Sequence, residues 1–72
     1  MNKLQPHQQR VVDEKNELDA KTEALSDFLR TDFFHTLSTD EQGRMRAQRL
    51  IMCAYSSILG SRIAAFAGVS AQ

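Results

Sequence analysis

The chain has 72 residues, and its nine acidic side chains balance its nine lysines and arginines, so the formal net charge is zero. Its length allows one domain with a small core, expected to span residues 1–72, and the regular recurrence of its apolar residues (42% of the chain is hydrophobic) excludes a disordered chain. Neutrality argues against duplex nucleic acid as a partner, because binding to a phosphate backbone requires a broad basic face.

The first predicted helix covers about residues 6–30. Pro6 suits a first helical turn, because its fixed φ and missing N–H are tolerated there, and no glycine or further proline interrupts the range. Apolar residues recur at every seventh position: Leu4, Val11, Leu18 and Leu25. The second core position of each repeat is polar, at Glu14 and Lys21. We therefore expect a narrow apolar stripe on a helix that is half exposed.

The segment after this helix is predicted to be an apolar turn. Three apolar residues lie in it: Phe33, Phe34 and Leu37. We expect them to plug the closed end of a helical hairpin. Ser38 is then followed three residues later by Glu41, which is the signature of a capping box. In such a box the Ser38 hydroxyl accepts the amide of Glu41, and the Glu41 carboxylate accepts the amide of Ser38.

The second predicted helix covers about residues 39–67, with Gly68 as its natural stop. Its apolar stripe also has a period of seven: Met45, Met52, Leu59 and Phe66. Ser56, Gly60 and Ala64 form a ridge of small residues that lets two helices approach closely. The apolar arc is wider than one antiparallel partner can cover, so we expect contacts between subunits. The expected oligomer interface comprises Met52, Ser56, Leu59, Gly60, Ile63, Ala64 and Phe66.

These elements predict an all-α fold, an antiparallel two-helix hairpin that assembles into a homodimer or a larger helical bundle, up to a hexamer. Self-association is expected because a two-helix chain shields only one face of each helix. A membrane-spanning helix at residues 50–69 is the alternative, since about 20 residues can cross a bilayer. Arg62 and three serines within that segment argue against a membrane partner.

The sequence holds no catalytic constellation, and we expect neither an enzyme, nor a metal site, nor a cofactor. His7 and His35 would lie at opposite ends of the hairpin, too far apart to share a metal ion. Cys53 is the only cysteine, which excludes an intramolecular disulfide, and we expect it to be a buried thiol in an apolar stretch. Glycine-rich phosphate loops and nucleophile motifs are absent from the sequence. The chain is therefore predicted to bind rather than to catalyse.

The open end of the predicted hairpin gathers polar residues around Arg62. A guanidinium on an apolar face needs a partner, and one interpretation pairs Arg62 with Glu14 or Glu17 across the hairpin or the dimer. In the other interpretation Arg62, with Arg10 and Tyr55, binds a phosphate and stacks a base at a subunit boundary. The candidate ligand-binding residues are Arg10, Glu14, Gln48, Tyr55 and Arg62.

Other polar residues of the second helix have two interpretations each. Gln48, expected on the inward side, either sets the register of the core or contacts the ligand. Arg44, Arg46 and Arg49 form either a solvated face or part of an anion site.

The spacing of residues in both helices resembles that of small helical-hairpin proteins related to the crAss phages, over about residues 6–63. In the first helix the resemblance is carried by the run from Pro6 to Lys15 and then by Leu18, Lys21, Leu25 and Phe28. In the second helix it is carried by Leu37, Glu41, Arg44, Met45, Gln48, Met52, Tyr55, Leu59, Arg62 and Ile63.

More distantly, the chain is similar to the hairpin domain of phage anti-CBASS and anti-Thoeris sponges. The similarity lies in the paired Gln8 and Gln9 at the start of the first helix, and in Ser38, Glu41 and Gln42 at the start of the second. Those sponges are small helical oligomers that sequester cyclic nucleotide signals made by bacterial immune enzymes. This chain departs from them in its short N-terminal arm, which in the sponges helps to form the ligand pocket.

The resemblance implies a phage counter-defence protein of the infected bacterial cytoplasm, which sequesters a cyclic di- or trinucleotide at subunit interfaces without catalysis. Two alternatives stay open. One is a phage protein that inhibits a host protein by direct protein–protein binding, and the other is a small membrane-associated or structural phage accessory protein. The expected partners are therefore further copies of the chain, together with a cyclic nucleotide or a host protein.

Overall fold

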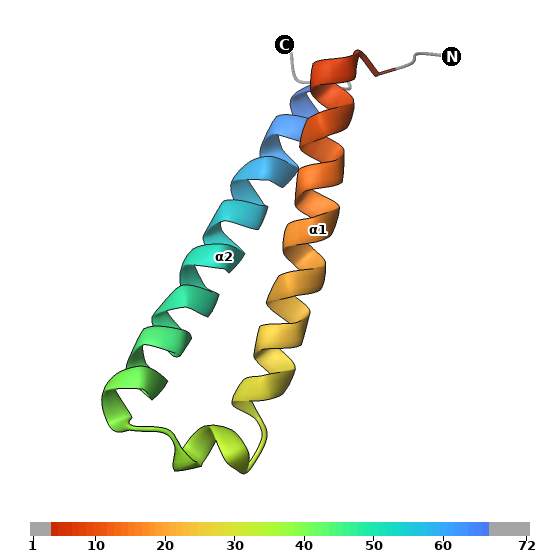
Figure 1. Cartoon of the computed structure of the whole chain (residues 1–72). Coiled ribbons are helices and arrows are strands. Elements are labelled where there is room, and N and C mark those ends of the chain that lie inside the picture. Colours follow the sequence, from red (N-terminus) through yellow and green to blue (C-terminus); the bar gives the residue numbers. More distant parts are fainter. Residues whose placement is uncertain (1–3, 67–72) are drawn as a thin grey trace.

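The protein is an antiparallel helical hairpin, seen in a computed structural model that describes residues 4–66 (Figure 1). Helix α1 spans Pro6–Leu29, a short 3-10 helix η1 spans Phe33–Thr36, and α2 spans Thr39–Phe66. Both described ends lie at the same end of an elongated molecule (Figure 1). The all-α hairpin is thus confirmed, with α1 ending one residue earlier than predicted. The predicted last residue of the second helix, Ala67, and the predicted stop, Gly68, lie outside the described residues.

Both long helices begin with side chains that satisfy free backbone groups. Before α1, the amide of Gln5 donates to the Gln8 side chain at 2.9 Å, and Pro6 occupies the first helical position. Before α2, the Ser38 hydroxyl accepts the amide of Glu41 at 3.1 Å, which confirms one half of the predicted capping box. The Glu41 carboxylate differs from the prediction, because it accepts from the guanidinium of Arg44 at 2.9 Å instead.

Within residues 4–66, three side chains are buried: Val11, Phe34 and Leu59. Phe34, in η1, is fully buried and packs edge-to-face on Phe28, with ring centroids 6.1 Å apart. Phe33 is 62% exposed, so the predicted apolar plug at the closed end consists mainly of Phe34. Burial of so few residues in a hairpin of this length leaves the stability of one chain marginal.

The two helices meet along seams with steps of three and four residues. On α1 the seam runs through Val11, Lys15, Leu18, Thr22, Leu25 and Leu29. On α2 it runs through Gln42, Met45, Arg49, Met52, Ser56, Leu59, Ile63 and Phe66. The second core position of α1 is therefore Lys15 and Thr22, whereas the predicted Glu14 and Lys21 are exposed. Apolar and polar layers alternate along the contact between the helices.

The side of α2 opposite to α1 is uncharged and uncovered. We call it the outer face; its exposed residues are Leu50, Ile51, Ala54, Ser57, Ile58 and Ser61. Three of its side chains, Leu50, Ile51 and Ile58, are 59–69% exposed although they are large and apolar. Cys53 is also exposed, contrary to the expectation of a buried thiol, because the helix turns this position away from α1. No helix within residues 4–66 is both long and apolar enough to cross a membrane.

Candidate functional site

The predicted site is organised around a contact between the two helices near the open end of the hairpin. The phenol of Tyr55 on α2 donates a hydrogen bond to a carboxylate oxygen of Glu14 on α1. This bond raises the pKa of Tyr55 above its ordinary value of 10.0, with smaller contributions from burial and from the negative charge of Glu14, and the positive charge of Arg62 opposes the shift. Tyr55 is 42% exposed and Arg62 is exposed. Both can therefore be reached by a ligand.

The structure brings together three of the five residues predicted to bind the ligand. Glu14, Tyr55 and Arg62 are neighbours, whereas Gln48 lies two turns before Tyr55, about 10 Å along the helix, and is exposed rather than inward. Its amide donates to the Met52 sulfur at 3.7 Å. Arg10 is exposed, one turn before Glu14.

The predicted ion pair of Arg62 with Glu14 or Glu17 is not what the hairpin shows. In residues 4–66 the ion pairs are Lys15–Asp19, Asp27–Arg30 and Glu41–Arg44. Glu14 accepts from Tyr55 instead. Within residues 4–66, Arg62 takes part in none of these ion pairs.

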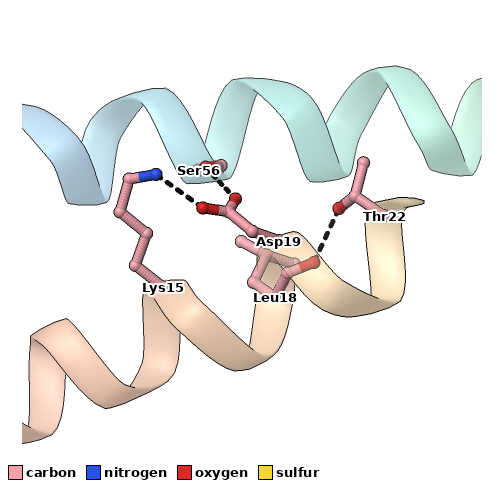
Figure 2. Close-up of polar contacts among 5 residues, drawn as sticks. All are labelled: Lys15, Leu18, Asp19, Thr22 and Ser56. Atoms are coloured by element: carbon pink, nitrogen blue, oxygen red, sulfur yellow. Dashed lines mark hydrogen bonds and ion pairs between the residues drawn. The ribbon is translucent and has the colours of Figure 1, made fainter. Parts of the chain in front are cut away.

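A polar layer next to this cluster holds the two helices in register (Figure 2). The Asp19 carboxylate accepts from Lys15 at 2.7 Å on its own helix and from the Ser56 hydroxyl on α2. These two hydrogen bonds lower the pKa of Asp19 below its ordinary value of 3.8, and the bond from Lys15 has the larger effect. Thr22 bonds the carbonyl of Leu18 at 2.8 Å and so satisfies its own hydroxyl within α1. Ser56 therefore serves the contact inside one hairpin.

Most residues predicted for the oligomer interface also lie between the two helices of one hairpin. Leu59 is fully buried, and a side chain at Gly60 would meet the Lys15 side chain at 3.3 Å. Others are half-buried along the seam: Met52, Ser56, Ile63 and Phe66. Ala64 is exposed. The exposed apolar side chains of Leu50, Ile51 and Ile58 belong to the outer face. The lack of charge from Leu50 to Ser61 is the sequence signal that could have located this face.

A second polar feature lies near the closed end. It is an open groove of about 450 Å³ between α1 and α2, lined by Ser26, Leu29, Arg30, Arg46, Arg49 and Leu50. The Nε of Arg49 donates to the Ser26 hydroxyl across the helices at 2.8 Å. Arg46 and Arg49, two of the three arginines that were predicted to form either a solvated face or part of an anion site, therefore line one groove. We call it the arginine groove.

The chemistry of the two features is that of binding. In the part of the chain that the structure describes, no three histidine, cysteine or acidic side chains gather in a way that could hold a metal ion. The groups that do gather are arginine guanidinium groups, the Tyr55 phenol with its bond to the Glu14 carboxylate, and apolar side chains. These groups recognise anions and flat or apolar surfaces.

The fold and these features define a small helical-hairpin protein. The model of the Sequestin family matches residues 5–65, so the chain belongs to the Sequestin family. The match covers α1, η1 and nearly all of α2. The family name indicates sequestration of a ligand or partner, which agrees with a binding rather than a catalytic role. Comparisons with curated proteins and with solved structures found no match.

Proposed function

We propose that the protein is a phage counter-defence protein that sequesters a cyclic nucleotide immune signal at interfaces between its subunits, without catalysis. Membership of the Sequestin family supports the sequestering part of the proposal. The resemblance of Gln8 and Gln9, and of Ser38, Glu41 and Gln42, to the helix starts of phage sponges supports the choice of ligand. The structural observation on which the proposal rests is the cluster of Glu14, Tyr55 and Arg62 beside the outer face.

This cluster has the groups that a nucleotide requires. Arg62 lies two helical turns after Tyr55, so both side chains leave the same side of α2. A guanidinium with free donors binds a phosphodiester, and an exposed phenol ring offers a stacking surface for a base. The hydrogen bond from Tyr55 to Glu14 fixes the ring before the ligand arrives, which lowers the entropy cost of binding.

The outer face supports the location at a subunit interface. Leu50, Ile51 and Ile58 stay largely exposed in one hairpin, and soluble chains seldom leave such a surface uncovered. If a second copy of the chain packed on this face, the edge of the interface would lie beside Tyr55 and Arg62. A ligand bound to these two residues would then be enclosed between subunits.

Thermal unfolding with a panel of cyclic di- and trinucleotides tests this proposal. A ligand at 100 times its Kd stabilises the folded state by about 2.7 kcal/mol, and it should be recovered unchanged by mass spectrometry after the protein is denatured. Arg62→Ala should abolish this stabilisation and spare the oligomer, because Arg62 belongs to none of the ion pairs in residues 4–66. Arg44→Ala is the matched control, since Arg44 is an exposed arginine at the other end of α2. If no member of the panel stabilises the protein, the sponge function is rejected.

Inhibition of a host protein is the second candidate, and the uncovered outer face is the observation that favours it. In that case the chain should bind one bacterial protein, and Ile51→Glu should abolish both the binding and the inhibition. Cyclic nucleotides should then leave the unfolding temperature unchanged. Mass spectrometry of small molecules that co-purify from cells with active immune signalling separates the two functions directly.

A further inference from the structure

We propose that the arginine groove is a second ligand site, which binds a small organic molecule carrying phosphate groups. The groove is separate from the Tyr55 cluster. Arg62 follows Arg49 by thirteen residues, so the two arginines lie about 20 Å apart along α2. At 3.6 residues per turn, Arg46 and Arg49 also flank the opposite edge of the outer face from Tyr55. The inference therefore goes beyond the proposed function and does not depend on it.

The charge of the groove selects an anion. Three of its six lining residues are arginines, and none is acidic. The negative charge described nearest to these arginines is that of Asp27, which forms an ion pair with Arg30 at 3.0 Å. The side chains of Arg30 and Asp27 are 69% and 67% exposed. Pairs so exposed contribute little, because water screens them and both side chains lose freedom. The positive charge of the groove is thus largely available to a ligand.

Two of the guanidinium groups are held in place by contacts that leave donors free. Arg49 uses its Nε to bind Ser26 at 2.8 Å, so both of its terminal amino groups can still donate. The Arg46 guanidinium carbon lies 5.0 Å from the centroid of the Phe34 ring, a cation–π contact that restrains the side chain without using its N–H groups. Phe34 is itself fully buried, so the platform is rigid. Donors positioned in advance lower the entropy cost of binding.

The remaining lining residues indicate the rest of the ligand. Leu29 and Leu50 give the groove an apolar part; Leu50 lies where the outer face meets the groove and is 64% exposed. A volume of about 450 Å³ lies within the range of sites for small organic molecules. The planar fork of arginine matches the oxygens of a phosphate group, which carries more charge than a carboxylate and so gains more from three cations. An extended nucleic acid fits less well, because the chain as a whole is neutral.

Titration by NMR spectroscopy tests the proposal on the full chain. Adenosine triphosphate is the organic probe, inorganic pyrophosphate is the probe without an organic part, and sodium sulfate at matched ionic strength is the control anion. We expect saturable shifts of the Nε–H resonances of Arg46 and Arg49, with adenosine triphosphate binding more tightly than pyrophosphate. Equal binding of the two probes would contradict the role of Leu29 and Leu50. Shifts that do not saturate, or that sulfate reproduces, would overturn the site.

Variants locate the binding in the groove. Arg46→Gln and Arg30→Gln should each raise the Kd on the order of tenfold, the loss expected for one charge-assisted hydrogen bond. Arg44→Gln removes a neighbouring exposed arginine that does not line the groove and should leave the Kd unchanged. An equal loss in Arg44→Gln would mean general charge attraction and would reject the site.

Asp27→Asn provides a gain-of-binding variant on an exposed residue, so it should not disturb folding. It should lower the Kd, because it removes the carboxylate that competes for Arg30. Arg62→Ala should bind adenosine triphosphate as the unaltered chain does, which keeps this result independent of the sponge experiment.

Discussion

Tyr55 and Glu14 join the two helices by a hydrogen bond between side chains that are 41 positions apart in the sequence. The bond lies towards the open end, where the hairpin has no turn to connect α1 and α2 (Figure 1). It therefore contributes to closing the hairpin and also orients the aromatic ring of the proposed ligand site. One contact thus has both a structural and a functional role.

The ionisation of Tyr55 provides a test of this contact. Because the hydrogen bond to Glu14 raises the pKa of Tyr55, the folded state holds the phenolic proton more tightly than the unfolded state does. The stability from this contact should be present below about pH 10 and should be lost as the pH rises through the raised pKa. Tyr55 is the only tyrosine and the chain has no tryptophan, so phenolate absorbance reports on this residue alone. Glu14→Gln should move the titration midpoint of Tyr55 back towards its ordinary value. An ordinary midpoint in the unaltered chain would contradict the hydrogen bond between Tyr55 and Glu14.

The Asp19 carboxylate should govern part of the acid unfolding. Its hydrogen bonds from Lys15 and Ser56 lower its pKa, so the unfolded state binds the proton more readily. The corresponding stability is present above about pH 3.8 and is lost as the pH falls through the lowered pKa. In Asp19→Asn, the free energy of unfolding should fall less as the pH is lowered, as measured by circular dichroism. Glu17→Gln removes an exposed acid of the same helix and should keep the loss of stability at low pH. The same pH dependence of stability in both variants would contradict the contacts of Asp19 with Lys15 and Ser56.

Phe34 and Phe33 form a matched pair for the closed end. Phe34 is fully buried, and replacement of a buried phenylalanine by alanine costs about 3 kcal/mol or more, so Phe34→Ala should unfold much of the chain. Phe33 is 62% exposed and contacts Phe28 only edge-to-face, at a centroid distance of 6.0 Å. Phe33→Ala should therefore cost less than about 1.5 kcal/mol. Urea unfolding measures both, and similar losses would show that Phe34 is not the plug.

The sequence predicted the helices well but not the rotation of α1. The boundaries followed from Pro6 and from the Ser38 cap, which act locally. The stripe of Val11, Leu18 and Leu25 can be completed by residues three or four positions later, and after Val11 and Leu18 both choices are polar. Packing selects Lys15 and Thr22, because their side chains point towards α2 in the observed register. A helix-to-helix register of this kind cannot be derived from one helix alone.

The same limit applies to the sites. Arg46 and Arg49 are three positions apart on α2, which the sequence shows, but Arg30 reaches them only because the turn brings α1 to that level. Glu14, Tyr55 and Arg62 were grouped correctly because the level of residues in an antiparallel hairpin follows from the position of the turn. Gln48 was expected inward but is exposed, because the seam of α2 passes through Met45, Arg49 and Met52 and leaves Gln48 on its outer edge.

Gly60 should tolerate alanine less well than Gly43 does. Both are in α2, where alanine in place of glycine gains about 1 kcal/mol of helix propensity. At Gly43 a Cβ atom meets nothing within 4 Å, so Gly43→Ala should show most of this gain. At Gly60 the Cβ atom would lie 3.3 Å from Cε of Lys15, which must move and thereby weaken its contact with Asp19. Equal gains in thermal unfolding would refute the close approach of α1 and α2 at Gly60.

Ile58→Glu tests whether the outer face is covered by a second copy of the chain. Ile58 is 59% exposed in the hairpin, so a charge there should leave the single chain folded. In an assembly it would bury an unpaired carboxylate, which is costly enough to separate the subunits. We therefore expect sedimentation to show oligomers for the unaltered chain and monomers for Ile58→Glu, with helical content retained. Ala20→Glu, at an exposed position of α1, should stay oligomeric. An unaltered chain that is monomeric at every concentration would leave the apolar outer face without its proposed partner and would remove the subunit interface from the proposed function.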